Sequence, residues 1–253
     1  MRCVNLQGTQ WKEDVFPECD QFNGIHEGLV QSWKDIFPKK GEIHFAGALE
    51  NNEDTGTLQY LASTAMEAGF STRVLDMQAL DLQNGRFFDP AGELVNRCFK
   101  LYPWEWMVDE SPDGCLAEME WLEPIWKLVM SNKAILATLY ELFPDSPYVL
   151  PCYLSRPRSG LFCKKPVFSR EGHNVSVVDI RDWEEYVRIA ETEGDYNTGA
   201  YVYQEYVEPT AYSGRYPVIG SWIIGGEAAG IGIRENRMEV TDNLSEFVPH
   251  IIG

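Results

Sequence analysis

The pattern of apolar residues changes along this chain, near residues 115–150, from alternating strand and helix signals to a succession of short strands. In the first part, Glu42–Ala48 has the character of a buried strand, and Ser71–Asp76 is expected to form a second strand. Thr55–Ala68 between them has helical spacing that ends at Gly69. A strand, a helix and a second strand in this order predict a βαβ unit of the α/β class.

Helical spacing recurs in three other segments, Gln21–Phe37, Glu118–Leu142 and Trp183–Glu191. After Pro151, short apolar strands with tight glycine turns predominate, which is typical of an antiparallel sheet. The chain is therefore expected to combine an α/β part with an α+β part. The later strands are expected within residues 161–168, 174–180, 200–207, 216–226 and 227–233.

The charge balance limits the class of partner. The chain has 253 residues, with 21 Lys and Arg against 39 Asp and Glu, so its formal net charge is −18. Its length suits one large domain or two small ones, and a hydrophobic content of 44% is enough for a sizeable core. Nucleic acid is excluded as the main partner, because binding a phosphate backbone needs a basic surface. Nucleotides stay possible, since a local basic pocket can lie within an acidic surface.

Other global signals argue against a secreted protein, a membrane protein and a zinc protein. The N-terminal sequence MRCVNLQGTQWKED lacks the apolar region of a secretory signal, and no run of about 18 apolar residues is present for a membrane span. The six cysteines form no CxxC pair and the four histidines are scattered. We therefore expect free thiols, a cytoplasmic protein and no metal ligands.

The strongest candidate for a functional site is KKPVFSREGHNVSVV, residues 164–178. Lys165 at a strand end precedes a Ser-Arg-Glu-Gly turn that contains Arg170, and another strand follows. Such a hairpin can fold over a polyphosphate, with Lys165 as a point charge near the α- and β-phosphates and Arg170 as a bidentate clamp. Gly172 would let the backbone approach closely. The alternative is a surface hairpin with solvated charges.

Three other segments contain candidate residues, each with a plainer alternative. Lys133 lies late in the helical pattern of WLEPIWKLVMSNKAIL, where a half-buried ammonium needs an anion, although a lysine at a helix edge can also extend into water. Arg234 follows a glycine-rich strand and could face a phosphate or carboxylate, or form a surface salt bridge. The strand VYQEYVEP could read an adenine edge with its backbone or be an ordinary alternating strand. The residues concerned there are Gln204, Glu205, Tyr206 and Val207.

Several familiar signatures of other sites are missing from the sequence. No GxGxxG follows a strand, and neither the P-loop signature nor GxSxG is present, so the Rossmann, P-loop and commonest serine hydrolase interpretations are poor. The aromatic segment YPWEW, residues 102–106, could line a substrate cleft, although core or interface packing is the commoner role of such residues.

Several ordered blocks resemble the glutathionylspermidine synthase family, which has an ATP-grasp fold, along nearly the whole chain. The resemblance implies an α/β substrate-side domain over residues 1–117, similar to a pre-ATP-grasp domain, and an ATP-grasp domain over residues 118–253. The blocks are DQFNGIHEGLV, FKLYPWEW, WLEPIWKLVMSNKAIL, KKPVFSREGHNV, VYQEY, YPVIGSWIIGGEAAGIGIRE and FVPHII.

The resemblance also implies an ATP-dependent carboxylate–amine ligase. In that reaction ATP phosphorylates a carboxylate to an acyl phosphate, an amine attacks, and phosphate leaves. A glutathione-like carboxylate and a polyamine-like amine are the expected substrates. Lys133 and Lys165 match the family's lysines that bind ATP phosphates. Arg170 matches its mobile-loop arginine, Arg234 matches a late active-site arginine, and 204–207 match the adenine-side segment.

The sequence departs from the family at its N-terminus. Family members carry there an Arg-x-Asp element and a segment like EYNADTPT, whose carboxylates and asparagine resemble Mg²⁺ ligands. No EYNAD-like segment is found in these 253 residues. The resemblance therefore implies an N-terminally incomplete ATP-grasp protein that uses ATP and Mg²⁺, with metal ligands expected in the missing segment. The alternative is a truncated ATP-binding module, or a partner-dependent relic, without ligase activity.

Overall fold

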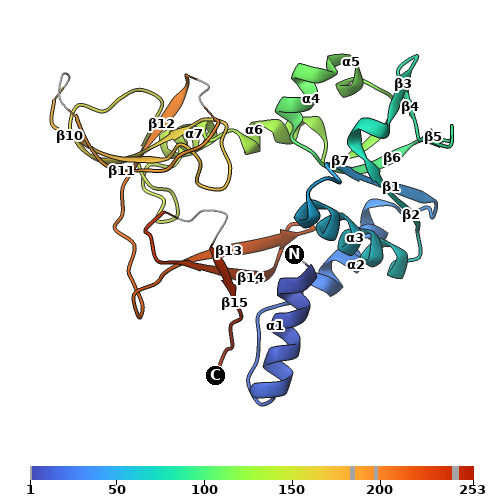
Figure 1. Ribbon diagram of the computed structural model, residues 1–253, viewed down its shortest axis with the longest axis horizontal. Coiled ribbons are helices and arrows are strands. Elements are labelled where there is room, and N and C mark those ends of the chain that lie inside the picture. The colour runs from blue at the N-terminus through green and yellow to red at the C-terminus, as the bar shows by residue number, and fades with distance from the viewer. Residues whose placement is uncertain (1, 183–185, 197–198, 241–244) are drawn as a thin grey trace. The chain divides into compact units, whose positions relative to one another are not determined.

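The computed structural model describes residues 2–182, 186–196, 199–240 and 245–253 (Figure 1). The backbone packs into two compact units. The first contains Met1–Lys127, Ile219–Ile233 and Val248–Gly253, and the second contains Leu128–Val218 and Arg234–Phe247. Compactness alone assigns no function to either unit, so the division into a substrate-side domain and an ATP-grasp domain at residue 117 stays a prediction.

The first unit is built on a fully parallel sheet of four strands. They are β1 (Glu42–Gly47), β2 (Ser71–Asp76), β6 (Arg97–Leu101) and β7 (Glu120–Leu122), in the order β2-β1-β6-β7. Helix α3 (Asn52–Glu67) connects β1 to β2, so the predicted βαβ unit is confirmed. The helix begins where the Asn51 side chain accepts the backbone N–H groups of Glu53 and Asp54, and the chain leaves it at Gly69, whose φ is +93°.

The remaining elements of the first unit are short. A small antiparallel sheet follows β2 in the sequence and contains β3 (Asp81–Gln83), β4 (Arg86–Phe88) and β5 (Leu94–Val95). The helices are α1 (Arg2–Val15), α2 (Ile25–Ile36), α4 (Trp104–Glu110) and α5 (Pro112–Cys115), with 3-10 turns η1 (Met77–Ala79) and η2 (Ile125–Lys127).

The core of the first unit lies where α2 and α3 pack on the parallel sheet (Figure 1). Trp33 of α2 meets Phe45 of β1 edge-on, with 5.5 Å between ring centroids, and Phe99 of β6 at 6.3 Å. Leu58 of α3 is fully buried in the same cluster. The indole Nε1 of Trp33 donates to Thr64 Oγ1 at 2.8 Å, so the polar edge of this ring is satisfied inside the core.

The second unit contains a five-stranded antiparallel sheet. Its strands are β8 (Cys152–Tyr153), β9 (Gly160–Pro166), β10 (Ser176–Ile180), β11 (Tyr186–Glu191) and β12 (Tyr201–Glu205), in the order β11-β10-β9-β12-β8. Helices α6 (Leu128–Ser131) and α7 (Ala134–Leu142) precede it, and Ala137 of α7 packs against Cys152 and Val202. The antiparallel sheet predicted after Pro151 is confirmed.

A third sheet has residues in both units. It contains β13 (Tyr216–Ile224), β14 (Glu227–Asn236) and β15 (Glu246–Val248), in that order. The strands predicted within residues 216–226 and 227–233 are therefore present. None of the helices in the described ranges is both long and apolar enough to cross a bilayer.

Helix α2 begins later than the sequence pattern indicated. The prediction placed its start at Gln21, whereas the structure has it at Ile25. Residues before it pair with β14 instead: the Phe22 carbonyl accepts the N–H of Ile231 at 3.2 Å, and Asn23 forms a bridge with Gly230. Backbone pairing with a distant strand thus replaces the first helical turn.

The single helix predicted over residues 118–142 is wrong. Strand β7 joins the parallel sheet beside β6, and Pro124 follows it. Helices α6 and α7 are separate, because Asn132 Oδ1 accepts the N–H of Ala134 at 2.8 Å and gives α7 a start of its own.

The helix predicted over residues 183–191 is also wrong where the structure describes it. Tyr186–Glu191 forms β11, which pairs antiparallel with β10, while residues 183–185 lie outside the described residues. The spacing of apolar residues there fits a helix, but the backbone of β10 offers hydrogen-bond partners along this segment, with one irregularity of register between Val177 and Val178.

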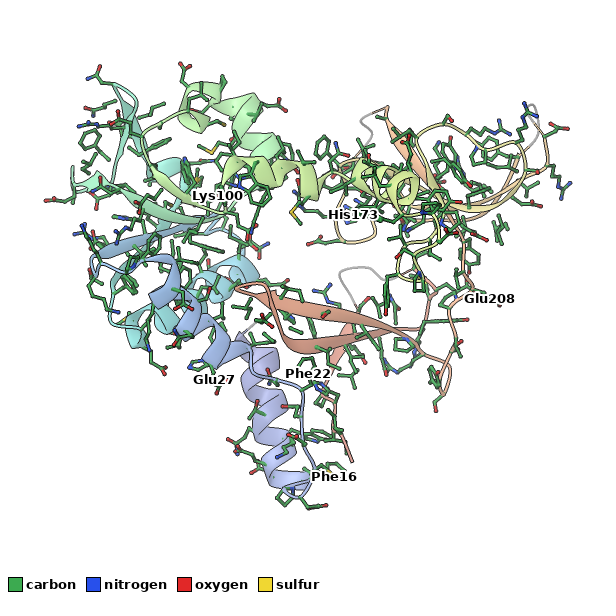
Figure 2. The ribbon with its side chains drawn as sticks, turned by 180° about the vertical axis from the view of Figure 1, so that it is seen from behind. Phe16, Phe22, Glu27, Lys100, His173 and Glu208 are labelled. Atoms are coloured by element: carbon green, nitrogen blue, oxygen red, sulfur yellow. The ribbon has the colours of Figure 1, made fainter. Side chains whose placement is uncertain are left out.

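A buried lysine lies beside the aromatic segment 102–106 (Figure 2). Lys100 of β6 is 8% exposed, and its Nζ lies 3.9 Å from the centroid of the Trp104 ring. The same Nζ donates to the Tyr102 carbonyl at 2.7 Å. Burial lowers the pKa of Lys100 to about 8. Trp104 is buried as well, with its Nε1 donating to the Glu123 carbonyl at 3.2 Å, so this indole serves packing.

The cysteines whose side chains are described carry free thiols, as the sequence predicted. Burial raises the pKa of Cys98 to about 12, so this thiol stays protonated at neutral pH. The five residues are Cys19, Cys98, Cys115, Cys152 and Cys163.

We expect Thr64→Val to lower the free energy of unfolding by about 1–3 kcal/mol, because the buried indole N–H of Trp33 loses its acceptor. Urea denaturation measures this cost. In a Trp33→Phe background, which has no N–H donor, the same substitution should cost clearly less. An equal cost in both backgrounds would contradict the role assigned to this hydrogen bond.

The lowered pKa of Lys100 predicts a pH dependence of stability. Between about pH 8 and the ordinary value of 10.5, the unfolded chain holds more protons than the folded chain. The free energy of unfolding should therefore rise with pH over this interval, by at most about 1.4 kcal/mol per pH unit, relative to a Lys100→Met variant. Urea unfolding of both proteins at several pH values measures the difference, and a difference that does not change with pH would refute the prediction.

Candidate functional site

The candidate site contains the hairpin formed by β9 and β10. The two strands pair antiparallel, with Lys164 opposite Ser176, and residues 167–175 form the connecting loop. The hairpin predicted from KKPVFSREGHNVSVV is therefore confirmed. Lys165 lies on β9 and Arg170 lies in the loop, so both predicted phosphate-binding cations belong to this one local structure.

The loop turns sharply just after Arg170. The His173 N–H donates to the Arg170 carbonyl at 2.9 Å and closes the turn. Glu171, Gly172 and Asn174 have left-handed φ angles of +58°, +74° and +55°. Gly172 adopts this conformation without steric cost, and asparagine tolerates it better than most residues, so the sequence suits the turn.

Lys133 binds this loop. Its backbone N–H donates to the Val167 carbonyl at 2.8 Å, and its Nζ donates to Ser169 Oγ at 2.9 Å and to the Ser169 carbonyl. The residue is the N-cap of α7 rather than a late position in a long helix, and its ammonium binds Ser169. Ser169 was available in the sequence as part of the Ser-Arg-Glu-Gly turn, but its pairing with Lys133 was not foreseen.

Lys165 contacts a second predicted residue. Its Nζ donates to Gln204 Oε1 at 2.7 Å. The register of β9 against β12 places Lys165 opposite Val202 and Cys163 opposite Gln204, so these four side chains share one face of the sheet. Burial raises the pKa of Cys163, although Lys165 opposes the shift, and the thiol is therefore protonated at neutral pH.

Lys164 points to the other face of the same sheet. Its Nζ lies 3.9 Å from the ring centroid of Tyr201, and the register pairs it with Tyr203. Two neighbouring lysines on one strand therefore have different surroundings, and Lys164 provides a matched control for Lys165.

The strand end predicted to read an adenine edge is fixed by backbone hydrogen bonds. The Glu205 N–H donates to the Pro151 carbonyl at 2.8 Å, and the Tyr206 N–H donates to the Leu161 carbonyl at 3.0 Å. The Tyr206 hydroxyl donates to Glu239 Oε2 at 2.7 Å, and burial together with this carboxylate raises its pKa. Val207 lies just beyond the strand with its side chain exposed.

Arg234 lies on β14, and its guanidinium carbon is 4.5 Å from the ring centroid of Phe247 on β15. This cation–π contact orients the guanidinium against the third sheet. The structure thus joins Lys133 and Arg170 through the loop, and Lys165 and Gln204 through a hydrogen bond. The roles of these residues, and of Arg234, stay predictions.

A cavity of about 730 Å³ lies beside the loop in the second unit. Gly172 and His173 contribute to its wall from the loop. His173 is labelled in Figure 2. The wall continues with residues 189–193, Tyr216 and residues 237–240. Gly172, which was selected from the sequence as a candidate site residue, lines this cavity.

Sequence reasoning missed Thr192, which lines the cavity and contacts the loop. Its Oγ1 accepts the Val175 N–H at 3.0 Å and donates to the Gly172 carbonyl. Thr192 directly follows the segment whose spacing indicated a helix, and threonine is common at strand ends, so no sequence signal marked it.

The sequence matches the family model described as "Glutathionylspermidine synthase preATP-grasp" over residues 5–253. The chain belongs to this family. The resemblance noted in the separate sequence blocks is thereby confirmed. Within the glutathionylspermidine synthase family, the relatives that match the chain include proteins named as ligases and synthetases.

Three relatives show how much of a family member this chain represents. It is 34% identical to "Putative acid--amine ligase" of Haemophilus influenzae, over 95% of this chain and 65% of that protein. It is 28% identical to "Trypanothione synthetase" of Crithidia fasciculata, over 98% of this chain and 42% of that protein. It is 26% identical to "Bifunctional glutathionylspermidine synthetase/amidase" of Escherichia coli, over 91% of this chain and 42% of that protein. The chain therefore spans less than two thirds of the length of these family members.

Similar folds occur among solved structures. The chain superposes on a "Putative gamma-glutamylcysteine synthetase" of Methylobacillus flagellatus KT with a TM-score of 0.58 and 8% sequence identity, covering 98% of this chain and 85% of that chain. This likeness concerns the fold alone. It agrees with the architecture of this chain, which combines a parallel sheet with antiparallel sheets.

In this glutathionylspermidine synthase family member, Ser169→Ala should lower the free energy of unfolding by about 1.5–3 kcal/mol, because a charged donor loses one acceptor. Ser131→Ala is the matched control, since that exposed hydroxyl donates to the Leu128 carbonyl at 2.9 Å without a charged partner. The control should change stability by less than about 0.5 kcal/mol. Equal costs in urea denaturation would show that the Lys133–Ser169 contact does not stabilise the loop.

Proposed function

We propose that this chain supplies the nucleotide-binding part of an ATP-dependent carboxylate–amine ligase. In the proposed reaction a carboxylate oxygen attacks the γ-phosphorus of ATP, ADP leaves, and an acyl phosphate forms. The amine nitrogen then attacks the acyl carbon, phosphate leaves, and the nitrogen loses a proton. Phosphoryl transfer of this kind depends mainly on positioning and on positive charge near the phosphates.

The observation that carries the proposal is the placement of Lys165. Its ammonium donates to the amide oxygen of Gln204, a neutral group that orients the lysine without neutralising it. The charge therefore remains available for a phosphate oxygen. Lys165 is the last residue but one of β9, so it lies close to the start of the loop that carries Arg170, on the same hairpin.

The other predicted residues suit the phosphates of ATP by their chemistry. Lys133 places an ammonium at the loop, where it donates to Ser169. Arg170 has a planar guanidinium that can bind two phosphate oxygens at once, and Arg234 would supply a further guanidinium. Gly172 lets the loop backbone approach a ligand closely.

Mg²⁺ would neutralise phosphate charge in such a reaction and is usually held by carboxylates together with the phosphates. Within the ranges that the structure describes, no group of three or more histidine, cysteine, aspartate or glutamate side chains is placed to hold a metal ion. We therefore assign no metal ligand in this chain and no step to the metal.

The substrates are proposed from the names of the relatives. Glutathionylspermidine synthetases suggest a glutathione-like carboxylate as acyl donor and a polyamine-like amine as acceptor. Because the chain spans only part of these proteins, the substrates are proposed for the whole protein. The net charge of −18 would attract a cationic amine to the surface.

The proposal predicts different effects for two adjacent lysines. Titration calorimetry of ATP should show binding to the unaltered chain, and Lys165→Ala should weaken it by about tenfold or more, because a charge-assisted hydrogen bond to phosphate is lost. Lys164→Ala removes the same charge from the opposite face of the sheet and should change the affinity less than about threefold.

Two outcomes would refute the proposal. An equal loss of ATP affinity in both variants would show that ATP binding depends only on the overall charge of the chain. No binding of ATP by the unaltered chain, with or without Mg²⁺, would show that these residues do not form a nucleotide site in this chain.

A further inference from the structure

We infer that Thr192 is a positioning residue for Arg170, and that residues 192–196 form a strap that fixes the 167–175 loop. The inference deepens the proposed function and rests on it in one respect, since that function gives Arg170 a phosphate to bind. The contacts between strap and loop stand independently of any ligand.

The Thr192 side chain ties two points of the loop together. Its Oγ1 accepts the N–H of Val175 at 3.0 Å and donates to the carbonyl of Gly172. The backbone N–H of Thr192 donates to the Val175 carbonyl at 2.9 Å. One hydroxyl therefore joins the turn after Arg170 to the start of the returning strand.

The rest of the strap contacts the loop next to Thr192. Asn174 Oδ1 accepts the N–H of Tyr196 at 2.8 Å, and the rings of His173 and Tyr196 lie 5.9 Å apart between centroids. A Cβ on Gly194 would come within 2.5 Å of the His173 Cβ. Any larger residue at 194 would push the strap from the loop, so glycine permits this close approach.

Along the loop, Arg170 lies between two points that are held by hydrogen bonds, Ser169 and Gly172. On the side before it, Lys133 binds the Ser169 hydroxyl and carbonyl. On the side after it, Thr192 binds the Gly172 carbonyl, and the His173 N–H closes the turn onto the Arg170 carbonyl itself. The backbone from which the guanidinium projects is therefore held from both directions.

This arrangement has a functional consequence. A guanidinium binds a phosphate bidentately only in a narrow range of positions, and small displacements are costly. If the loop opens, only the remaining closed fraction can bind, and the apparent affinity falls in proportion. The strap also contributes Thr192 and Glu193 to the wall of the 730 Å³ cavity, so it belongs to the same part of the unit.

The loop contact is tested by limited proteolysis of the full chain with trypsin, which cleaves after Arg170 when the loop opens. Thr192→Val keeps the side-chain shape and removes the hydroxyl, and it should raise the rate of cleavage after Arg170 by about three- to tenfold. Thr192→Ser restores the hydroxyl and should cleave at close to the original rate. Cleavage after Lys164, which is paired on both sides within the antiparallel sheet, is the internal reference, because unfolding of the sheet would raise both rates.

The action through Arg170 is tested by ATP calorimetry. Thr192→Val should weaken ATP binding about three- to tenfold, Thr192→Ser should restore it, and in an Arg170→Ala background Thr192→Val should cause no further loss.

The outcomes separate this inference from the proposed function. Unchanged cleavage after Arg170 in Thr192→Val, or equal acceleration in Thr192→Ser, would overturn the strap. An undiminished effect of Thr192→Val in the Arg170→Ala background would overturn the positioning role. If the unaltered chain binds no ATP, the proposed function and the positioning role fail together, while the cleavage rates still decide whether the strap holds the loop.

Discussion

The candidate site depends on the hydrogen bonds that hold the 167–175 loop at both ends. A nine-residue loop between two strands loses much conformational entropy when it adopts one structure, so it needs fixed partners. Lys133 binds it next to α7, and Thr192 binds it from the segment after β11. These partners come from opposite sides of the loop in the sequence. The ordered form of the loop therefore depends on both elements being packed on the antiparallel sheet.

Neutral oxygen partners suit a site for an anionic ligand. Several cations of this acidic chain pair with carboxylates, as Arg97 does with Glu120 at 2.7 Å and Arg73 with Glu42 at 2.9 Å. Lys165 instead donates to an amide oxygen. This bond fixes the position of the ammonium without neutralising its charge. A net charge of −18 therefore does not prevent local attraction of a phosphate, because charge at a contact distance outweighs screened charge on a distant surface.

The sequence predicted those elements whose structure is set locally. The βαβ unit was predictable because α3 has a side-chain cap and a glycine end, and because β1 is a largely apolar segment that is buried along most of its length. The segment Tyr186–Glu191 was mispredicted, since its helical spacing competes with pairing to β10, which no local pattern reveals. Lys165 and Arg170 could be placed together because one hairpin holds both. Thr192 could not, because its contacts join the loop to a segment about 20 residues away in the sequence.

Lys164 and Lys165 show why the register of β9 matters to the proposed chemistry. Successive side chains of a strand point to opposite faces, so a shift by one residue would turn Lys164 toward Gln204 and Lys165 toward Tyr201. Pairing with β10 on one side and with β12 on the other fixes the register against this shift. The position of the Lys165 ammonium, which is proposed to bind phosphate, is thus decided by backbone pairing across three strands.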